Sequence, residues 1–295
     1  MTSMPTPKRR SIWPYTLAIL VVLGAATAIG LVVYQHAGPS VDASTLIDHE
    51  DFQCYAVSES ARTVAMARID RKQLQVRRME RLLGTGKLDE LDHAKLQAEL
   101  AIVVWDLEEA RFQRECAEAY FRPGSTHLRK TFEGAPPRMD TRRASAAFHA
   151  ALDTVEPRLL PHGFDERAEL HLAQIAIREG HPDEALSLAT RRLEAHPDGL
   201  YADSFQLVAA DALLDLGRSG ESLTYYQLAG KLKIGLDAHY ARYRLAMLER
   251  ADDHDDEADK LLADVDRWAR RGDREALVKV LEGKPPVPPK PTKTP

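Results

Sequence analysis

The chain has 295 residues, a formal net charge of −5, 29% charged residues and 44% hydrophobic residues. This composition is typical of a folded protein and excludes a fully disordered chain, and the negative net charge argues against nucleic acid as a general partner. Strong helix formers dominate, aromatic residues make up only 6%, and Asn is absent. We therefore expect an all-α protein without an N-glycosylation site.

The first feature along the chain is an uncharged apolar run at 12–34. A helix of this length spans a hydrocarbon core of roughly 30 Å, so the run predicts a single transmembrane helix. Three basic residues at 8–10 precede the run and acidic residues follow it. This asymmetry predicts an inner-membrane protein with a cytoplasmic N-terminus and a periplasmic C-terminal domain. The alternative is a cleaved signal peptide, because the Ala-Thr-Ala sequence at 26–28 resembles a cleavage site.

Residues 52–121 are expected to form a hairpin of two long helices. Apolar residues recur at helical spacing on both sides of a break at Gly84–Gly86. A short polar loop between long helices predicts antiparallel neighbours. The first helix is basic towards its end and the second is acidic, which favours their pairing. The alternative interpretation is that these are two solvated faces whose charge pairs contribute little.

The two cysteines of the chain, Cys54 and Cys116, are expected at the same level of this hairpin. Cys54 lies about 29 residues before Leu83, and Cys116 lies about 27 residues after Asp89. At about 1.5 Å of rise per residue, the two thiols fall within one helical turn of the same height. In an oxidising compartment this geometry allows a disulfide that clamps the open end of the hairpin. Two buried free thiols are the alternative.

Small residues repeat at a fixed spacing in the C-terminal half of the chain. In three copies a small residue of one helix precedes a small residue of the next by twelve positions, and successive copies are offset by 37 and 36 residues. Such periods indicate a helical repeat array, here expected at 141–281, with a helix at 141–160 covering its first unit. The three pairs are Ala173 with Ala185, Ala210 with Ser222, and Ala246 with Ala258.

These segments resemble tetratricopeptide repeats. The segment Arg178–Asp198, REGHPDEALSLATRRLEAHPD, has the Gly, the Glu-Ala pair and the closing Pro of that family. The resemblance covers roughly residues 166–270 and implies stacked helix pairs with a concave binding face. The aromatic positions of the first helices are mostly missing, Ala251 replaces the turn glycine of the third copy, and the period exceeds the usual 34 residues. A helical array of another kind is the alternative.

No segment carries a convincing catalytic or metal site. The residues Leu83–Leu88 lack the first glycine and the hydroxyl residue of a phosphate-binding loop. The histidines do not follow a metal-ligand spacing, and the acidic segment at 252–257 lacks the glycine of a calcium loop. We therefore expect no catalytic residue, no metal, no cofactor and no enzymatic activity.

The expected function is that of a membrane-anchored interaction scaffold of the cell envelope, whose repeat array binds a partner protein or peptide. In outline the layout resembles bacterial ancillary translocon subunits. The alternative is that the hairpin is the working surface, as a coiled-coil element for homo-oligomerisation or for assembly of a secretion or envelope complex. The candidate partner-binding residues are Tyr201, Phe205, Tyr225, Tyr240 and Tyr243, although aromatics at helical spacing more often belong to a core.

The expected organisation comprises a cytoplasmic tail (1–11), a transmembrane helix (12–34), a linker (35–51), the helical hairpin (52–121), a second linker (122–140), the repeat domain (141–281) and a disordered Pro/Lys-rich tail (282–295).

Overall fold

The computed structural model describes residues 43, 46–58, 60–121, 137–231 and 235–283. Within these residues the regular structure consists of eleven α-helices, labelled α2 to α12, and one short 3-10 helix, without a strand. The expected all-α class is therefore confirmed. The expected tail at 1–11, all but the first two residues of the expected tail at 282–295, and most of the linker at 122–140 lie outside the described residues.

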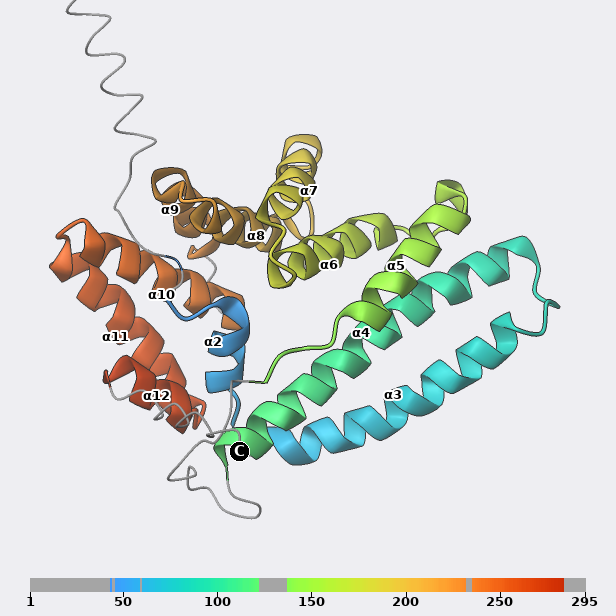
Figure 1. Cartoon of the computed structure of the whole chain (residues 1–295), viewed down its shortest axis with the longest axis horizontal. Helices are drawn as coiled ribbons and strands as arrows, with labels where there is room; N and C mark the ends of the chain where they lie inside the picture. The colour runs from blue at the N-terminus through green and yellow to red at the C-terminus, as the bar shows by residue number, and fades with distance from the viewer. Residues whose placement is uncertain (1–42, 44–45, 59, 122–136, 232–234, 284–295) are drawn as a thin grey trace, which may run out of the picture.

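The hairpin is built from α3 (Ala61–Leu83) and α4 (Glu90–Tyr120), which lie side by side in Figure 1. The carboxylate of Asp89 caps the start of α4 by accepting a hydrogen bond from the backbone N–H of Asp92. Charges pair across the two helices as their composition predicted, with Lys72 Nζ 2.6 Å from Asp106 Oδ2. The buried face of α3 carries Ala65, Ile69, Val76 and Met79 at helical spacing.

The first helix of the expected hairpin is interrupted. Residues 49–55 form a separate short helix, α2 (His49–Tyr55), and α3 begins only at Ala61. The prediction of one continuous helix from Phe52 to Leu83 is therefore wrong, as is a linker that extends to residue 51. Interior packing explains the break, because Phe52 belongs to the core of the C-terminal repeats whereas α3 packs along α4.

The C-terminal half is a series of helix pairs (Figure 1). The helix α5 precedes α6, and the pairs α6–α7, α8–α9 and α10–α11 follow, with α12 at the end. Neighbouring helices in this series are in contact, so each pair shares a core with the next. The bounds are α5 Arg142–Thr154, α6 Phe164–Arg178, α7 Pro182–Ala195, α8 Ala202–Asp215, α9 Ser219–Ala229, α10 Leu236–Ala251, α11 Asp255–Arg271 and α12 Glu275–Leu281.

The small residues that revealed the repeats lie in the interior of the helix pairs. All six are fully buried. In the second pair, the hydroxyl of Ser222 on α9 donates a hydrogen bond to the carbonyl of Ala210 on α8 at 2.9 Å, so the two residues spaced by twelve are in direct contact. A larger side chain at either position would separate the two helices. The architecture is thus that of a helical repeat.

The turns between paired helices also repeat in their backbone geometry. Gly180, Gly217 and Asp253 have φ values of 76°, 72° and 60°, and they are offset by 37 and 36 residues like the buried small residues. In each turn the next residue donates its backbone N–H to the carbonyl five residues before it, which is the Schellman ending of a helix. The residue at the turn position of the third copy is therefore Asp253, and its expected replacement by Ala251 is wrong.

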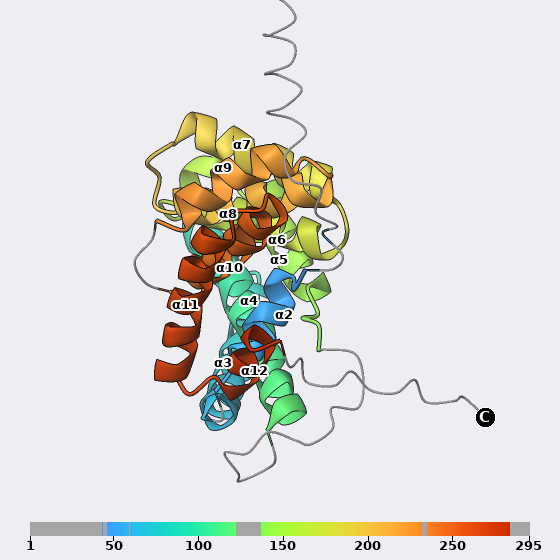
Figure 2. The same cartoon turned by 90° about the vertical axis from the view of Figure 1, so that its left-hand side faces the viewer.

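The helices together form an arch, and α2 lies inside it (Figures 1 and 2). The hairpin forms one side, α6 and α8 form the crown, and α10 to α12 form the other side. The helix α2 contacts α4 on the first side and both α10 and α12 on the second. Residues 46–55 therefore connect the two sides of the arch.

The predicted transmembrane helix is not supported by the structure. No helix among the described residues combines the length and the apolar character needed to cross a membrane. The longest, α4, has 31 residues but carries many acidic and basic side chains. The segment 12–34 itself lies outside the described residues. The prediction of a single-pass inner-membrane protein is corrected accordingly.

The close contact within each repeat leads to a stability prediction. Ala246 on α10 and Ala258 on α11 are fully buried in a pair of helices that pack together, so replacing Ala246 with Leu overpacks the interior of this pair. We expect Ala246→Leu to lower the free energy of unfolding by about 1–3 kcal/mol, measured by urea denaturation. The control is Ala195→Leu at the exposed end of α7, which should change stability by less than about 0.5 kcal/mol. Equal stability of both variants would contradict the proposed packing.

Candidate functional site

An open groove of about 1200 Å³ lies between α2 and the crown of the arch. One wall consists of α2 and residues 138–142, and the other consists of the C-terminal part of α6, the inner side of α8 and Arg244 of α10. Charged side chains line both walls. A groove of this volume is large enough to accept several residues of an extended peptide or a small molecule.

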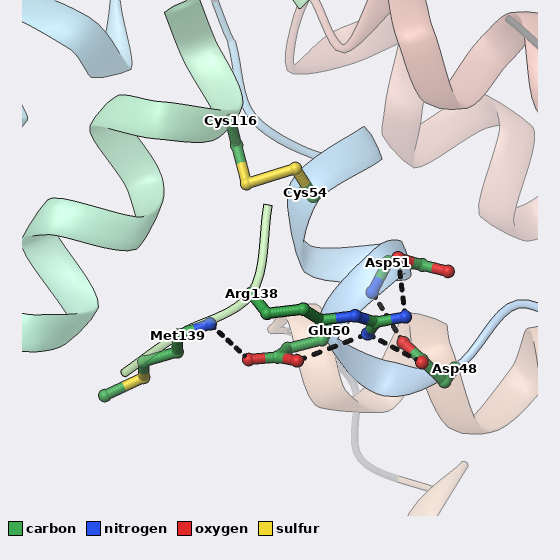
Figure 3. Close-up of a disulfide and its surroundings, with 7 residues drawn as sticks. All are labelled: Asp48, Glu50, Asp51, Cys54, Cys116, Arg138 and Met139. Atoms are coloured by element: carbon green, nitrogen blue, oxygen red, sulfur yellow. Dashed lines mark hydrogen bonds and ion pairs between the residues drawn. A yellow bond between two sulfur atoms is a disulfide. The ribbon is translucent and has the colours of Figure 1, made fainter. Parts of the chain in front are cut away.

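A disulfide holds the wall that α2 provides. Cys54 on α2 and Cys116 near the end of α4 form the bond, with their Cα atoms 5.1 Å apart (Figure 3). The predicted disulfide is present, but it does not clamp the open end of a two-helix hairpin, since Cys54 belongs to the separate helix α2. It joins α2 to the hairpin, and both cysteines are fully buried.

Aromatic packing holds the other side of α2. The ring of Phe52 lies 5.4 Å from that of Tyr240 and 5.7 Å from that of Tyr243, both on α10, and stacks parallel to Trp268 of α11. The imidazole of His49 hydrogen bonds to Asp237 Oδ1 at 3.1 Å. The helix that forms one groove wall is thus fixed to both sides of the arch.

A charged cluster fixes residues 138–142 against α2 (Figure 3). The buried carboxylate of Glu50 accepts hydrogen bonds from the backbone N–H of Met139 at 2.9 Å and from Arg138 Nη1 at 3.2 Å. It also forms an ion pair with Arg178 of α6 at 3.5 Å, which links this wall to the crown. The guanidinium of Arg138 is shared with Asp48, at 2.7 Å, and with Asp51, at 3.4 Å.

A second polar network lies under the opposite wall. Asp211 of α8 is buried, and its Oδ1 accepts hydrogen bonds from the hydroxyls of Tyr226 and Tyr240. Arg244 of α10 donates from Nε to the Tyr240 hydroxyl at 2.6 Å. Its Nη1 is buried and has no hydrogen-bond partner among the described residues. Burial raises the pKa of Asp211, so the interior of this wall is a poorly solvated environment for charge.

Two further carboxyl groups of the groove have raised pKa values. Burial, and next the charge of Asp48, raise the pKa of Asp51 from 3.8 to about 6. Burial, and next the charge of Asp211, raise the pKa of Asp215 from 3.8 to about 6. Both shifts have the same physical origin, because burial disfavours the ionised form and a neighbouring carboxylate adds repulsion. Perturbed groups that gather in a cleft are typical of functional sites.

None of the aromatic residues predicted to bind a partner lines this groove. Phe205, Tyr240 and Tyr243 are buried in the core. Tyr201 and Tyr225 are partly exposed and pack against the cluster of α6, α7 and α8. The structure therefore places three of the five in the interior and leaves two at the surface away from the groove.

The groove residues follow a sequence pattern that the aromatic-based prediction missed. Gln174 and Asp211 each follow the buried small residue of their first helix by one position, and Arg178 and Asp215 follow it by five. Polar residues at the same positions of the first two copies therefore mark the inner face there, whereas the third copy has Met247 and Ala251 at these positions. The contribution of α2 to the site has no such pattern, because it lies outside the repeats.

Comparison with known proteins gives no match: no protein-family model, no curated protein and no solved structure matches the chain. The relationship to tetratricopeptide repeats therefore rests on the residues of the repeats themselves and stays a prediction. Among the described residues there is also no group of three or more His, Cys, Asp or Glu side chains that could hold a metal ion.

The raised pKa of Asp215 leads to a prediction about stability and pH. A carboxyl group whose pKa is higher in the folded state than in the unfolded state destabilises the fold when it is ionised, and this penalty disappears as the pH falls from about 6 to below 3.8. We expect Asp215→Asn to stabilise the protein at pH 7.5 by about 1 kcal/mol, after allowance for solvent screening, and to have little effect at pH 4. Thermal unfolding at both pH values measures the difference.

Asp140 provides a control with the opposite sign. Hydrogen bonds from Arg142 lower the pKa of Asp140 to about 2, so its carboxylate stabilises the fold above pH 3.8. Asp140→Asn should therefore destabilise the protein at pH 7.5. If Asp215→Asn were also destabilising at that pH, the conclusion that the ionised carboxyl group of Asp215 destabilises the fold would be wrong.

Proposed function

We propose that this chain is an interaction protein whose groove binds an extended segment of a partner protein. The observation that carries the proposal is the groove itself, in which one wall is formed by α2, a helix fixed on its two sides by a disulfide and by an aromatic cluster. A preformed surface loses little conformational entropy on binding, which favours affinity. The repeat-like series of α6 to α11 supports the same role, since such arrays present extended concave surfaces.

A binding role fits the groove better than a catalytic one. Glu50 and Asp211 accept several hydrogen bonds each from neighbouring side chains or backbone, and these contacts hold the walls in place. Such satisfied, buried polar groups give a surface its shape and specificity. The unpaired groups at the groove are the ones that would contact a partner.

A second candidate function comes from the outer surface of the hairpin. Of the seven large apolar side chains that are exposed in the described part of the chain, five lie on the hairpin. Exposed apolar side chains on a long helix favour association with another helix. The hairpin could therefore mediate self-association. The five residues are Val64, Met66, Leu74 and Leu82 on α3 and Leu91 on α4.

Site-specific photo-crosslinking distinguishes the two candidates. A photoreactive residue is placed at Ile177 in the groove, at Leu74 on the outer side of α3, or at Ser187 on the exposed side of α7 as a control. The full chain is then irradiated in the cells that produce it. We expect Ile177 to give a discrete adduct with another protein that is absent at Ser187.

Three outcomes bear on the proposal. A discrete adduct from Ile177 alone supports binding in the groove. An adduct from Leu74 of twice the mass of the chain, with none from Ile177, would favour self-association through the hairpin and contradict the groove proposal. Equal adducts from Ile177 and Ser187 would show non-specific contact and would also contradict it.

A further inference from the structure

The charge of the groove is unbalanced. Seven carboxyl groups and four guanidinium groups line it, so its side chains carry an excess of three negative charges when all are ionised. Within the low-dielectric surroundings of a cleft, such an excess attracts cations and repels phosphates and acidic peptides. The groove is therefore electrostatically selective before any shape is considered.

Two of these carboxylates lack adequate partners. The carboxylate of Asp215 forms no ion pair and no hydrogen bond with any residue in the described part of the chain, and only the more distant charge of Arg244 favours its ionised form. Asp51 has a buried Oδ1 without a hydrogen-bond partner there, and its ion pair with Arg138 is shared with Asp48 and Glu50. Both carboxylates line the groove, so a cationic group in the groove can reach them.

The wall that faces α2 presents a hydrogen-bond donor without an acceptor. Arg244 is 3% exposed and lines the groove, and its Nη1 has no acceptor among the described residues. A buried donor without an acceptor is unfavourable, and a ligand that brings an acceptor relieves it. Asp211 on the same wall is already occupied by two tyrosine hydroxyls, so it does not compete for a ligand.

Resting on the function proposed above, we propose that the groove selects a basic, extended peptide segment of its partner. A Lys or Arg side chain of the segment pairs with Asp215 and Asp51, and a main-chain carbonyl of the segment accepts a hydrogen bond from Arg244 Nη1. A peptide is the ligand class that supplies a cation and a strong neutral acceptor a few ångströms apart. Phosphate-bearing ligands do not meet this requirement, because the carboxylates repel them.

The titration behaviour of the two acids is consistent with this assignment. The pKa values of Asp51 and Asp215 are both raised to about 6, which shows that each carboxylate is poorly stabilised in the unliganded groove. A bound cation stabilises the ionised form of both. The charged groups that face them are Asp48, Glu50, Arg138, Asp211 and Arg244, and all remain in place in the variants described next.

The test is selection of twelve-residue peptides from a random phage-displayed library on the full chain. Selected peptides are synthesised, and their dissociation constants are measured by fluorescence anisotropy. The comparison uses the wild-type chain, the double variant Asp51→Asn/Asp215→Asn, and the control Asp198→Asn/Asp256→Asn. The control removes the same charge from exposed positions outside the groove.

We expect the selected peptides to carry net positive charge, to bind the double variant about tenfold more weakly or worse, and to bind the control within about twofold of wild type. Basic peptides that bind all three proteins equally would overturn the inference, because their affinity would not come from the groove. If the selected peptides are neutral or acidic and the double variant binds them more weakly, the inferred preference for basic peptides is wrong but the proposed function stands. If the double variant weakens the binding of none of the selected peptides, both the basic specificity and the proposed function are wrong.

Discussion

The architecture depends on the way α2 is held between the two sides of the arch. Cys54 and Phe52 lie two residues apart on one short helix, and they enter different cores: Cys54 bonds to Cys116 of the hairpin, whereas Phe52 packs among Tyr240, Tyr243 and Trp268. A helix of seven residues has too few internal hydrogen bonds to be stable alone, so these contacts determine its position. The bond closes a loop of 62 residues, which corresponds to about 4 kcal/mol in the chain-entropy description. Burial of Phe52 adds a contribution of similar size, about 3–5 kcal/mol.

This arrangement also creates the groove and its unusual electrostatics. Because α2 is fixed opposite the inner face of the repeats, acidic residues from two distant parts of the chain are brought together. Glu50 is compensated by Arg138, Arg178 and a backbone N–H, whereas the charge of Arg244 offsets that of Asp215 only in part. A fold optimised for stability alone would not retain such charges, since each raises the free energy of the folded state. A partner that supplies the missing positive charge, as proposed above, would offset this cost, which is a trade between stability and function that is common at binding sites.

Much of the helical architecture could be predicted from the sequence, because its signals are local. The spacing of Ala210 and Ser222 reports the packing of two adjacent helices, and the break at 84–86 reports the hairpin loop. The site could be predicted only in part. The equivalent positions of Gln174 and Asp211 in their repeats indicate which side of the array is the inner face. No local sequence pattern indicates that α2 packs opposite this face. That contact joins residues separated by almost 190 positions, and His49 with Asp237 is its clearest example. Three of the five aromatic residues lie in the interior for a simple reason: large apolar rings in a helical array are mostly needed for its core.

The most direct test of the central claim is a measurement of the distance between the two sides of the arch. Nitroxide-bearing non-natural residues are placed at the exposed positions Lys95 on α4 and Asp256 on α11, and the distance distribution is measured by double electron–electron resonance. If α2 holds the sides together, the wild-type chain gives a narrow distribution. Phe52→Ala then gives a broad one with unchanged helical content by circular dichroism, and the control Leu200→Ala, at an 84% exposed residue, remains narrow. A distribution that stays narrow in Phe52→Ala would show that the arch is held without α2 and would contradict the account.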